Sequence, residues 1–117
     1  MKKSETLLAR RNAIVPNGMG MFSPLTISSG KGARINDVDG KEYIDFAGGI
    51  GVLNAGHCPK PVVDAIVKQS RQLIHACFPV AIYEPYVALC EKLAQLFPHG
   101  RKTKVMLTNS GVEAVEN

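Results

Sequence analysis

The sequence predicts an α/β fold, and three stretches carry that prediction. Asp39-Gly40 lies between two β-tolerant runs, a pattern typical of a β-hairpin turn. From Pro85 to Phe97, apolar residues recur three and four positions apart, as one face of a helix requires. Near the end, Lys102 to Thr108 has the pattern of a strand that leads through Asn-Ser-Gly into a further helix. The chain therefore combines helices with strands.

The hairpin is expected to have strands over residues 33–38 and 41–46, joined by the two-residue turn Asp39-Gly40. Both turn residues tolerate the positive φ angles that such a turn requires. Successive side chains of a strand point to opposite faces, so Ile44 and Tyr43 would point to different faces of the sheet. Two strands alone are only marginally stable, and the hairpin must therefore pack against another element.

Two more helices are expected on either side of the hairpin. Good helix formers from Ser4 to Ala13 predict a short helix that stops before Pro16. Pro61 suits the first turn of the other helix, whose apolar stripe runs through residue 74. The helix over 85–97 then follows and is the clearest in the sequence.

The stretch from Ala47 to Pro61 is rich in glycine and apolar residues. A loop this long and this apolar is rarely just exposed chain. It is expected to pack near a ligand pocket or a subunit contact, and a buried Ω-loop remains an alternative.

The turn at Asn109-Ser110-Gly111 is a candidate anion site. The first N–H groups of a helix have no partner within the helix, and the helix dipole adds about half a positive charge at that end. A phosphate group is the natural ligand of such a turn, and Gly111 lets the backbone approach it closely. The alternative is that Ser110 only caps the helix.

Composition and charge argue against several classes of protein. The chain is 45% hydrophobic and 21% charged, and it has no apolar run near the ~20 residues of a membrane span and no signal-peptide core. Its net charge of +4 is dispersed, which gives little support for nucleic-acid binding. Three cysteines without a Cys-x-x-Cys spacing indicate reduced thiols rather than disulfides. We expect a cytoplasmic protein.

Other kinds of site find little support. His57, Cys58, His75 and Cys77 could supply metal ligands, but two of them are adjacent and the spacing is poor, so no metal is expected. Ser110 lacks the Gly-x-Ser-x-Gly elbow of a nucleophile, and no Walker pattern is present.

Three motifs, in order, give a resemblance to a known family: RINDVDGKEYIDFAGGIGVLNAGH, YEPYVALCEKL and LTNSGVEAVEN. Together they resemble the N-terminal part of a class III pyridoxal-phosphate-dependent aminotransferase, in particular the bacterial 4-aminobutyrate enzymes, over nearly the whole chain. The resemblance implies a fold-type I homodimer that transfers the amino group of 4-aminobutyrate, or of a similar ω-amino acid, to 2-oxoglutarate. Acetylornithine, ornithine or a diamine remain open as alternative substrates of the same family.

The resemblance also assigns roles to individual residues. Ser110, Gly111 and Val112 match the turn that holds the cofactor phosphate. Val112 stands where the family usually has Ser or Thr, and loss of that hydroxyl would weaken cofactor binding by roughly 1.5–3 kcal/mol. Ile50 matches a residue that lines the substrate pocket, and Pro79 stands near the substrate where those enzymes tend to have Gln.

The resemblance further implies two parts and a missing remainder. Residues 1–60 match a small-domain segment with helix, hairpin and glycine-rich loop, and residues 61–117 match a helical linker and the beginning of the cofactor-binding large domain. The family's Schiff-base lysine, its pyridine-nitrogen aspartate and its substrate arginine all lie downstream of the phosphate turn, whereas every lysine here precedes it. We expect an N-terminal fragment without catalytic residues, inactive alone and with weak or absent cofactor binding. A non-catalytic folding or dimerisation module is the alternative.

His57, in the family's Gly-His motif, is expected to be structural.

Overall fold

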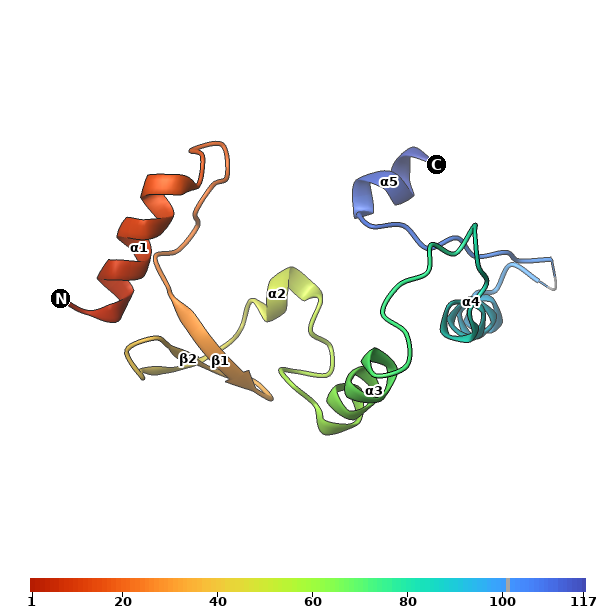
Figure 1. The fold of residues 1–117 in the computed structure, drawn as a ribbon, viewed down its shortest axis with the longest axis horizontal. Helices are drawn as coiled ribbons and strands as arrows, with labels where there is room; N and C mark the ends of the chain where they lie inside the picture. The colour runs from red at the N-terminus through yellow and green to blue at the C-terminus, as the bar shows by residue number, and fades with distance from the viewer. Residues whose placement is uncertain (101) are drawn as a thin grey trace. The chain divides into compact units, whose positions relative to one another are not determined.

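Figure 1 shows the computed structural model, which describes residues 1–100 and 102–117. Contacts divide the chain into two compact units, Met1–Gln69 and Ser70–Asn117. The first contains, in order, α1 (Lys3–Ile14), β1 (Ile27–Lys31), β2 (Arg34–Asp37), β3 (Glu42–Ile44), α2 (Gly48–Gly51) and α3 (Lys60–Ser70), which ends at the boundary. The second contains α4 (Glu84–Leu96) and α5 (Gly111–Glu116). Among the residues described, no helix is long and apolar enough to span a membrane.

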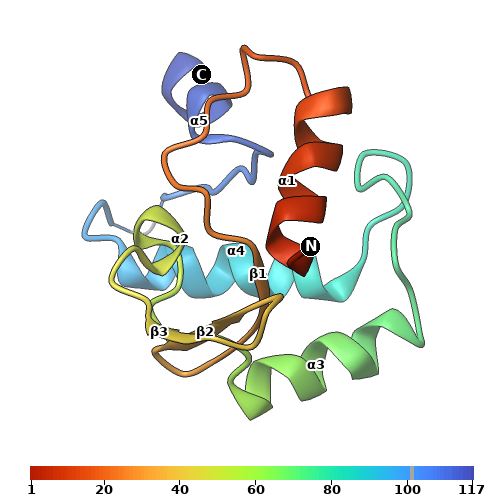
Figure 2. The same cartoon turned by 90° about the vertical axis from the view of Figure 1, so that its left-hand side faces the viewer.

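The three strands form one antiparallel sheet in the order β1-β2-β3 (Figure 2). Ile35 on the central strand is paired with Gly30 of β1 and with Tyr43 of β3. Ile35 is 9% exposed and Thr26, which precedes β1, is 6% exposed. Over residues 1–100 and 102–117 these two are the buried side chains, so the core lies at the centre of this sheet.

The hairpin between β2 and β3 is confirmed, but its turn has three residues rather than two. The Asp37 N–H donates to the Lys41 carbonyl oxygen at 2.9 Å, which leaves Val38, Asp39 and Gly40 in the turn. Gly40 has φ +89°, as the left-handed residue of a three-residue turn with a bulge should. The predicted Asp39-Gly40 turn and the longer strands were wrong because the bulge takes one more residue out of the pairing.

Asp39, in the turn of the hairpin, is hydrogen-bonded to the start of α1. The Asp39 carboxylate accepts hydrogen bonds from the N–H groups of Lys3 and Ser4, at 2.9 and 3.4 Å, and from the Ser4 hydroxyl. A carboxylate there satisfies N–H groups that have no partner in the helix and complements the helix dipole. The Ser4 hydroxyl, followed by the two N–H groups, holds the pKa of Asp39 below its ordinary value of 3.8. The predicted first helix is confirmed. The element against which the hairpin packs is β1, which pairs with β2.

The other predicted helices agree to different degrees. α4 matches the expected helix over 85–97 to within one residue at each end. α3 ends at Ser70, so the predicted extension through residue 74 was wrong. Leu73 and Ile74 are 37% and 87% exposed. An apolar stripe extends a helix only where another surface packs on it, because propensity alone stabilises a helix weakly.

The segment over residues 103–108 is not a strand. In the described part of the chain it makes no β-pairing, and a strand requires a neighbour to complete its backbone hydrogen bonds. A side chain holds it instead, since the Leu107 N–H donates to the Tyr86 hydroxyl at 3.1 Å. The predicted strand over Lys102 to Thr108 was therefore wrong for this chain.

We expect the Gly40→Ala substitution to loosen the hairpin. A side chain at φ +89° costs roughly 1–2 kcal/mol, which corresponds to about a 5–30-fold faster amide exchange at Asp37. Gly20→Ala is the control, because an added Cβ at Gly20 meets nothing within 4 Å and no positive φ is required there. Equal exchange in both variants would contradict the assigned turn.

Candidate functional site

Ser110 begins α5 and closes the candidate anion turn. Its backbone is extended, with φ −147° and ψ 157°, and its hydroxyl oxygen accepts the Glu113 N–H at 3.2 Å. The Glu113 carboxylate accepts the Asn109 N–H at 2.8 Å, an arrangement close to a capping box. The capping role predicted as the alternative for Ser110 is therefore present in the structure. Its hydroxyl hydrogen remains available as a donor.

Gly111 and Val112 present the next two backbone N–H groups. Within the described residues neither N–H has an acceptor, as expected in the first turn of a helix. A Cβ added at Gly111 would meet nothing within 4 Å, so the space beside the turn is open. Val112 is 65% exposed, and its side chain carries no donor. Two N–H groups and the Ser110 hydroxyl thus form a donor set that suits a phosphate.

An aromatic cluster holds the segment that enters this turn. Tyr86, whose hydroxyl accepts the Leu107 N–H, stacks on Phe78 with 3.9 Å between ring centroids and 15° between planes. Tyr83 contacts Phe78 edge-on at 5.5 Å. Because Pro79 follows Phe78 directly, the cluster connects the chain at Pro79 with the segment leading to the anion turn, all within the second unit.

Pro79 itself lies in a tight turn. The N–H groups of Val80 and Ala81 both donate to the Cys77 carbonyl oxygen, at 2.8 and 3.1 Å, and Cys77 has φ +49°. Proline has no N–H and no polar side-chain atom. Its side chain can therefore offer a ligand only apolar contact.

Ile50 lies in the first unit, within a left-handed turn. Gly48, Gly49, Ile50 and Gly51 have φ angles of +51°, +63°, +60° and +80°. This conformation suits glycine, but for a β-branched residue it is an outlier that costs about 1–3 kcal/mol. The Ile50 side chain is 86% exposed, so packing of its own does not offset that cost.

A contact between Asp45 and His57 closes the loop that carries Ile50. One carboxylate oxygen of Asp45 accepts the N–H groups of Ala47 and Gly48, both at 2.9 Å. The other lies 2.7 Å from Nε2 of His57. The two side chains are 11% and 23% exposed. We call residues 45–57 the 45–57 loop.

Both ends of the 45–57 loop are fixed to Gly32 and Ala33, in the turn between β1 and β2. The Asp45 N–H donates to the Ala33 carbonyl oxygen at 2.9 Å, and His57 exchanges two backbone hydrogen bonds with Gly32, at 2.8 and 2.9 Å. The His57 ring lies so close to Gly30 that an added Cβ would be 2.7 Å from its Cγ. His57, which we expected to be structural, joins the loop to the sheet.

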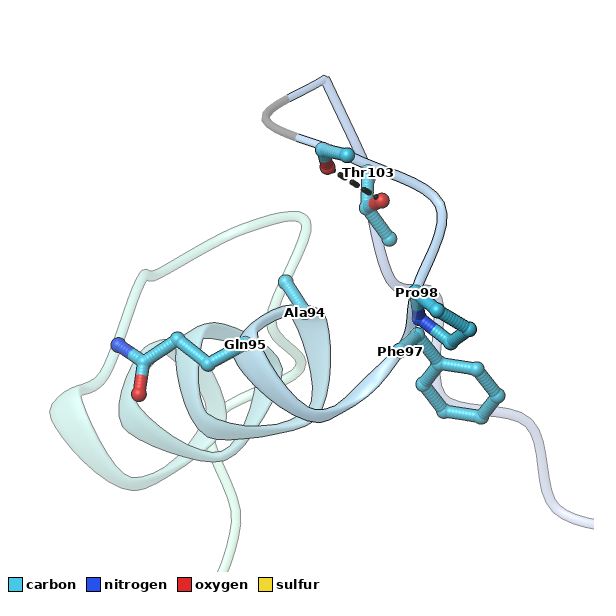
Figure 3. A pocket seen from close by; sticks show the side chains of 6 residues that line it. Ala94, Gln95, Phe97, Pro98 and Thr103 are labelled. Atoms are coloured by element: carbon cyan, nitrogen blue, oxygen red, sulfur yellow. Dashed lines mark hydrogen bonds between the residues drawn. The ribbon is translucent and has the colours of Figure 1, made fainter.

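Two cavities lie apart from the predicted residues. A depression of about 600 Å³ at the end of α4 is lined by Ala94, Gln95, Phe97, Pro98, Gly100 and Thr103 (Figure 3). There the Thr103 hydroxyl donates to the Gly100 carbonyl oxygen at 2.8 Å. An apolar cavity of about 440 Å³ lies between the 45–57 loop and the exposed apolar face of α3. The described residues contain no group of three or more potential metal ligands.

The structure thus places Ile50 in the first unit, and Pro79 with Ser110, Gly111 and Val112 in the second. Sequence analysis did not select Asp45 or Tyr86. Asp45 carried a usable signal, because an aspartate two residues before a glycine-rich run commonly accepts backbone N–H groups of the turn that follows. Tyr86 carried none, because its partner lies 21 residues away.

The hairpin, the glycine-rich loop, the three long helices α1, α3 and α4, and the turn into α5 are elements that also form a segment of solved fold-type I pyridoxal-phosphate enzymes. The sequence profile of the family Aminotransferase class-III matches residues 14–117. The chain belongs to this family, which confirms the resemblance and the predicted fold class.

Individual relatives agree with this assignment. The chain is 47% identical to the 5-aminovalerate aminotransferase of Pseudomonas putida, over 99% of this chain and 27% of that protein. It is 44% identical to the 4-aminobutyrate aminotransferase of Escherichia coli, over 100% of this chain and 28% of the relative. A solved acetylornithine aminotransferase from Elizabethkingia anophelis superposes with a TM-score of 0.87 at 28% identity, over 99% and 29% of the two chains. An ornithine aminotransferase from Toxoplasma gondii gives a TM-score of 0.84 at 33% identity, over 99% and 26%. The chain spans just over a quarter of the length of these relatives.

We expect the hydrogen bonds of Asp45 to weaken in acid. The His57 side chain, then the Gly48 and Ala47 N–H groups, hold the pKa of Asp45 below its ordinary 3.8. Since the folded pKa lies below the unfolded one, this stabilisation is present above 3.8 and is lost as pH falls through the lowered pKa. The Gly48 amide shift, followed by NMR, should titrate with a midpoint below 3.8 and lose this transition in Asp45→Asn. A midpoint at or above 3.8 would contradict the assigned bonds.

We expect Tyr86→Phe to release the segment before the anion turn. One net hydrogen bond contributes about 0.5–1.5 kcal/mol, so amide exchange at Leu107 should become roughly 2–10-fold faster while the Phe78 stack remains. Tyr83→Phe is the matched control, because the Tyr83 hydroxyl makes no hydrogen bond within the described residues. The same exchange rate in both variants would show that the bond does not hold the segment.

Proposed function

We propose that this chain serves in a pyridoxal-phosphate-dependent aminotransferase that transfers the amino group of 4-aminobutyrate, or of a similar ω-amino acid, to 2-oxoglutarate. The observation that carries the proposal is the match along the entire chain to proteins named 5-aminovalerate and 4-aminobutyrate aminotransferase. These two amines are ω-amino acids that differ by one methylene group. A substrate pocket shared by both would follow the aliphatic chain between amine and carboxylate.

The cofactor phosphate is proposed to bind at Ser110, Gly111 and Val112. The Gly111 and Val112 N–H groups have no acceptor within the described residues, and the space beside Gly111 is open at the positive end of the α5 dipole, which supports this assignment. When bound, pyridoxal phosphate supplies an electron-accepting ring that stabilises negative charge on the carbon bearing the amine. The role of this chain is to bind and orient, and we assign no acid, base or nucleophile among its residues.

Ile50 and Pro79 are proposed to line the substrate pocket. Both offer only apolar contact, which suits the methylene chain of an ω-amino acid. Pro79, however, replaces the Gln that the resemblance leads us to expect near the substrate. Together with solved relatives named ornithine and acetylornithine aminotransferase, this keeps those amines, or a diamine, as the second candidate substrates.

We also propose how the chain contributes to the domains and subunits of the enzyme. Residues 1–60 would form a small-domain segment, and residues 61–117 a linker and the beginning of the cofactor-binding domain of a homodimer. The three free cysteines support a reducing, cytoplasmic location. The competing hypothesis is a non-catalytic folding or dimerisation module.

A chimera distinguishes the two hypotheses. Residues 1–117 replace the matching segment of the Escherichia coli 4-aminobutyrate aminotransferase, to which they are 44% identical. We expect the chimera to bind pyridoxal phosphate and to convert 4-aminobutyrate and 2-oxoglutarate. The 117-residue chain alone is the control and should show no turnover, because none of its lysines stands at the family's Schiff-base position. A folded, cofactor-bound chimera that is inactive with 4-aminobutyrate, 5-aminovalerate, ornithine and acetylornithine would refute the proposed function.

In the same chimera, we expect Val112→Thr to tighten cofactor binding. The added hydroxyl can donate to a charged phosphate oxygen, which contributes roughly 1.5–3 kcal/mol and lowers the Kd by about tenfold to a hundredfold. The measurement is a cofactor titration followed by absorbance. Val115→Thr, the same change one turn further along α5, should leave the Kd unchanged. Equal effects of both substitutions would argue against a phosphate at this turn.

A further inference from the structure

We propose that Asp45 and His57 are positioning residues that fix the left-handed turn over residues 48–51 and so set where Ile50 meets the substrate. The inference rests on the proposed function, because it concerns how a pocket residue is placed. Asp45 and His57 would influence which amine is preferred by positioning Ile50, and they would not contact the substrate themselves.

Ile50 has an unfavourable backbone conformation. At φ +60° and ψ 53° its β-branched side chain is in a strained region that glycine or asparagine would occupy more easily. With 86% of the residue exposed, no burial within this unit offsets the strain. Such strain persists only where the surrounding structure imposes it, and it collects at ligand-binding sites.

Hydrogen bonds at both ends of the turn hold Ile50 in this conformation. Asp45 accepts the N–H groups of Ala47 and Gly48, so its carboxylate fixes the entry to the turn. Within the turn, the N–H groups of Val52 and Leu53 return to the Gly48 carbonyl oxygen at 3.0 and 2.9 Å. Asp45 therefore fixes the peptide group that joins Ala47 to Gly48, and the carbonyl oxygen of that same peptide accepts the Ile50 and Gly51 N–H groups at 2.8 and 3.2 Å.

Asp45 is itself held in place by contacts with His57 and Ala33. Its second carboxylate oxygen contacts His57, whose backbone is paired with Gly32 and whose ring fills the space left by the missing Cβ of Gly30. The Asp45 N–H donates to the carbonyl oxygen of Ala33, which follows Gly32 in the turn between β1 and β2. A continuous series of contacts thus runs from the sheet through His57 and Asp45 to the peptide that joins Ala47 to Gly48, whose carbonyl oxygen accepts the Ile50 N–H.

The position of Ile50 should affect which of two amine substrates the enzyme prefers. One methylene more or less in an apolar pocket changes the relative kcat/KM of two substrates by about 10–200-fold. Loss of the Asp45 carboxylate should let the turn relax and move the Ile50 side chain. The ratio of kcat/KM for 4-aminobutyrate and 5-aminovalerate should then change by about tenfold, mainly through KM.

A double-mutant cycle in the chimera tests this directly. Asp45→Ala should change the selectivity ratio when Ile50 is present and leave it unchanged when Ile50→Gly has removed the side chain. Asp45→Asn keeps an oxygen for the Ala47 and Gly48 N–H groups and should restore most of the original ratio. Asp64→Ala, which removes an exposed α3 carboxylate paired with Lys60, is the control and should have no effect. Equal changes with and without the Ile50 side chain would overturn the proposal.

A second measurement separates this proposal from the proposed function. If the chimera with the original residues is folded but inactive, the proposed function fails, and the turn is then tested in the 117-residue chain itself. There, Asp45→Ala should make amide exchange at Val52 and Leu53 about tenfold faster, and Asp64→Ala should not. Unchanged exchange in Asp45→Ala would show that Asp45 does not hold the turn.

Discussion

The contact between Asp45 and His57 is the constraint on which the first unit's candidate pocket residue depends. It joins two residues 12 positions apart and closes the 45–57 loop against the turn between β1 and β2. Because the carboxylate also accepts two backbone N–H groups, one side chain links the sheet, the loop closure and the glycine-rich turn. The hairpin is fixed to α1 in a similar way, since the carboxylate of Asp39 accepts the first N–H groups of that helix.

Features set by neighbours along the chain could be predicted from the sequence. α1 and α4 follow from helix formers, proline positions and apolar spacing, and the hairpin follows from its turn residues. Ser110 caps α5 as its position before the helix suggested. In each case the decisive atoms lie within a few residues of one another, so local patterns contain the information.

Features set by distant partners could not be predicted. The hairpin's three-residue turn depends on register, which one strand cannot specify alone. The segment before the anion turn lacks the backbone neighbour that would make it a strand, and it is held instead by Tyr86. The glycines at 48, 49 and 51 indicated an unusual loop, but only the bonds from Asp45 to the Ala47 and Gly48 N–H groups explain why Ile50 shares their left-handed conformation.

Backbone strain coincides with one of the residues that the family resemblance assigns to the substrate pocket. Three residues other than glycine have positive φ in the described chain: Ile50, Cys58 and Cys77. The first is the predicted pocket residue, the second follows His57 directly, and the third accepts both hydrogen bonds of the Pro79 turn. A chain free to relax would have glycine or asparagine at such positions. For Ile50, hydrogen bonds within its own unit hold the backbone in this region, and they leave the exposed side chain free to contact a ligand.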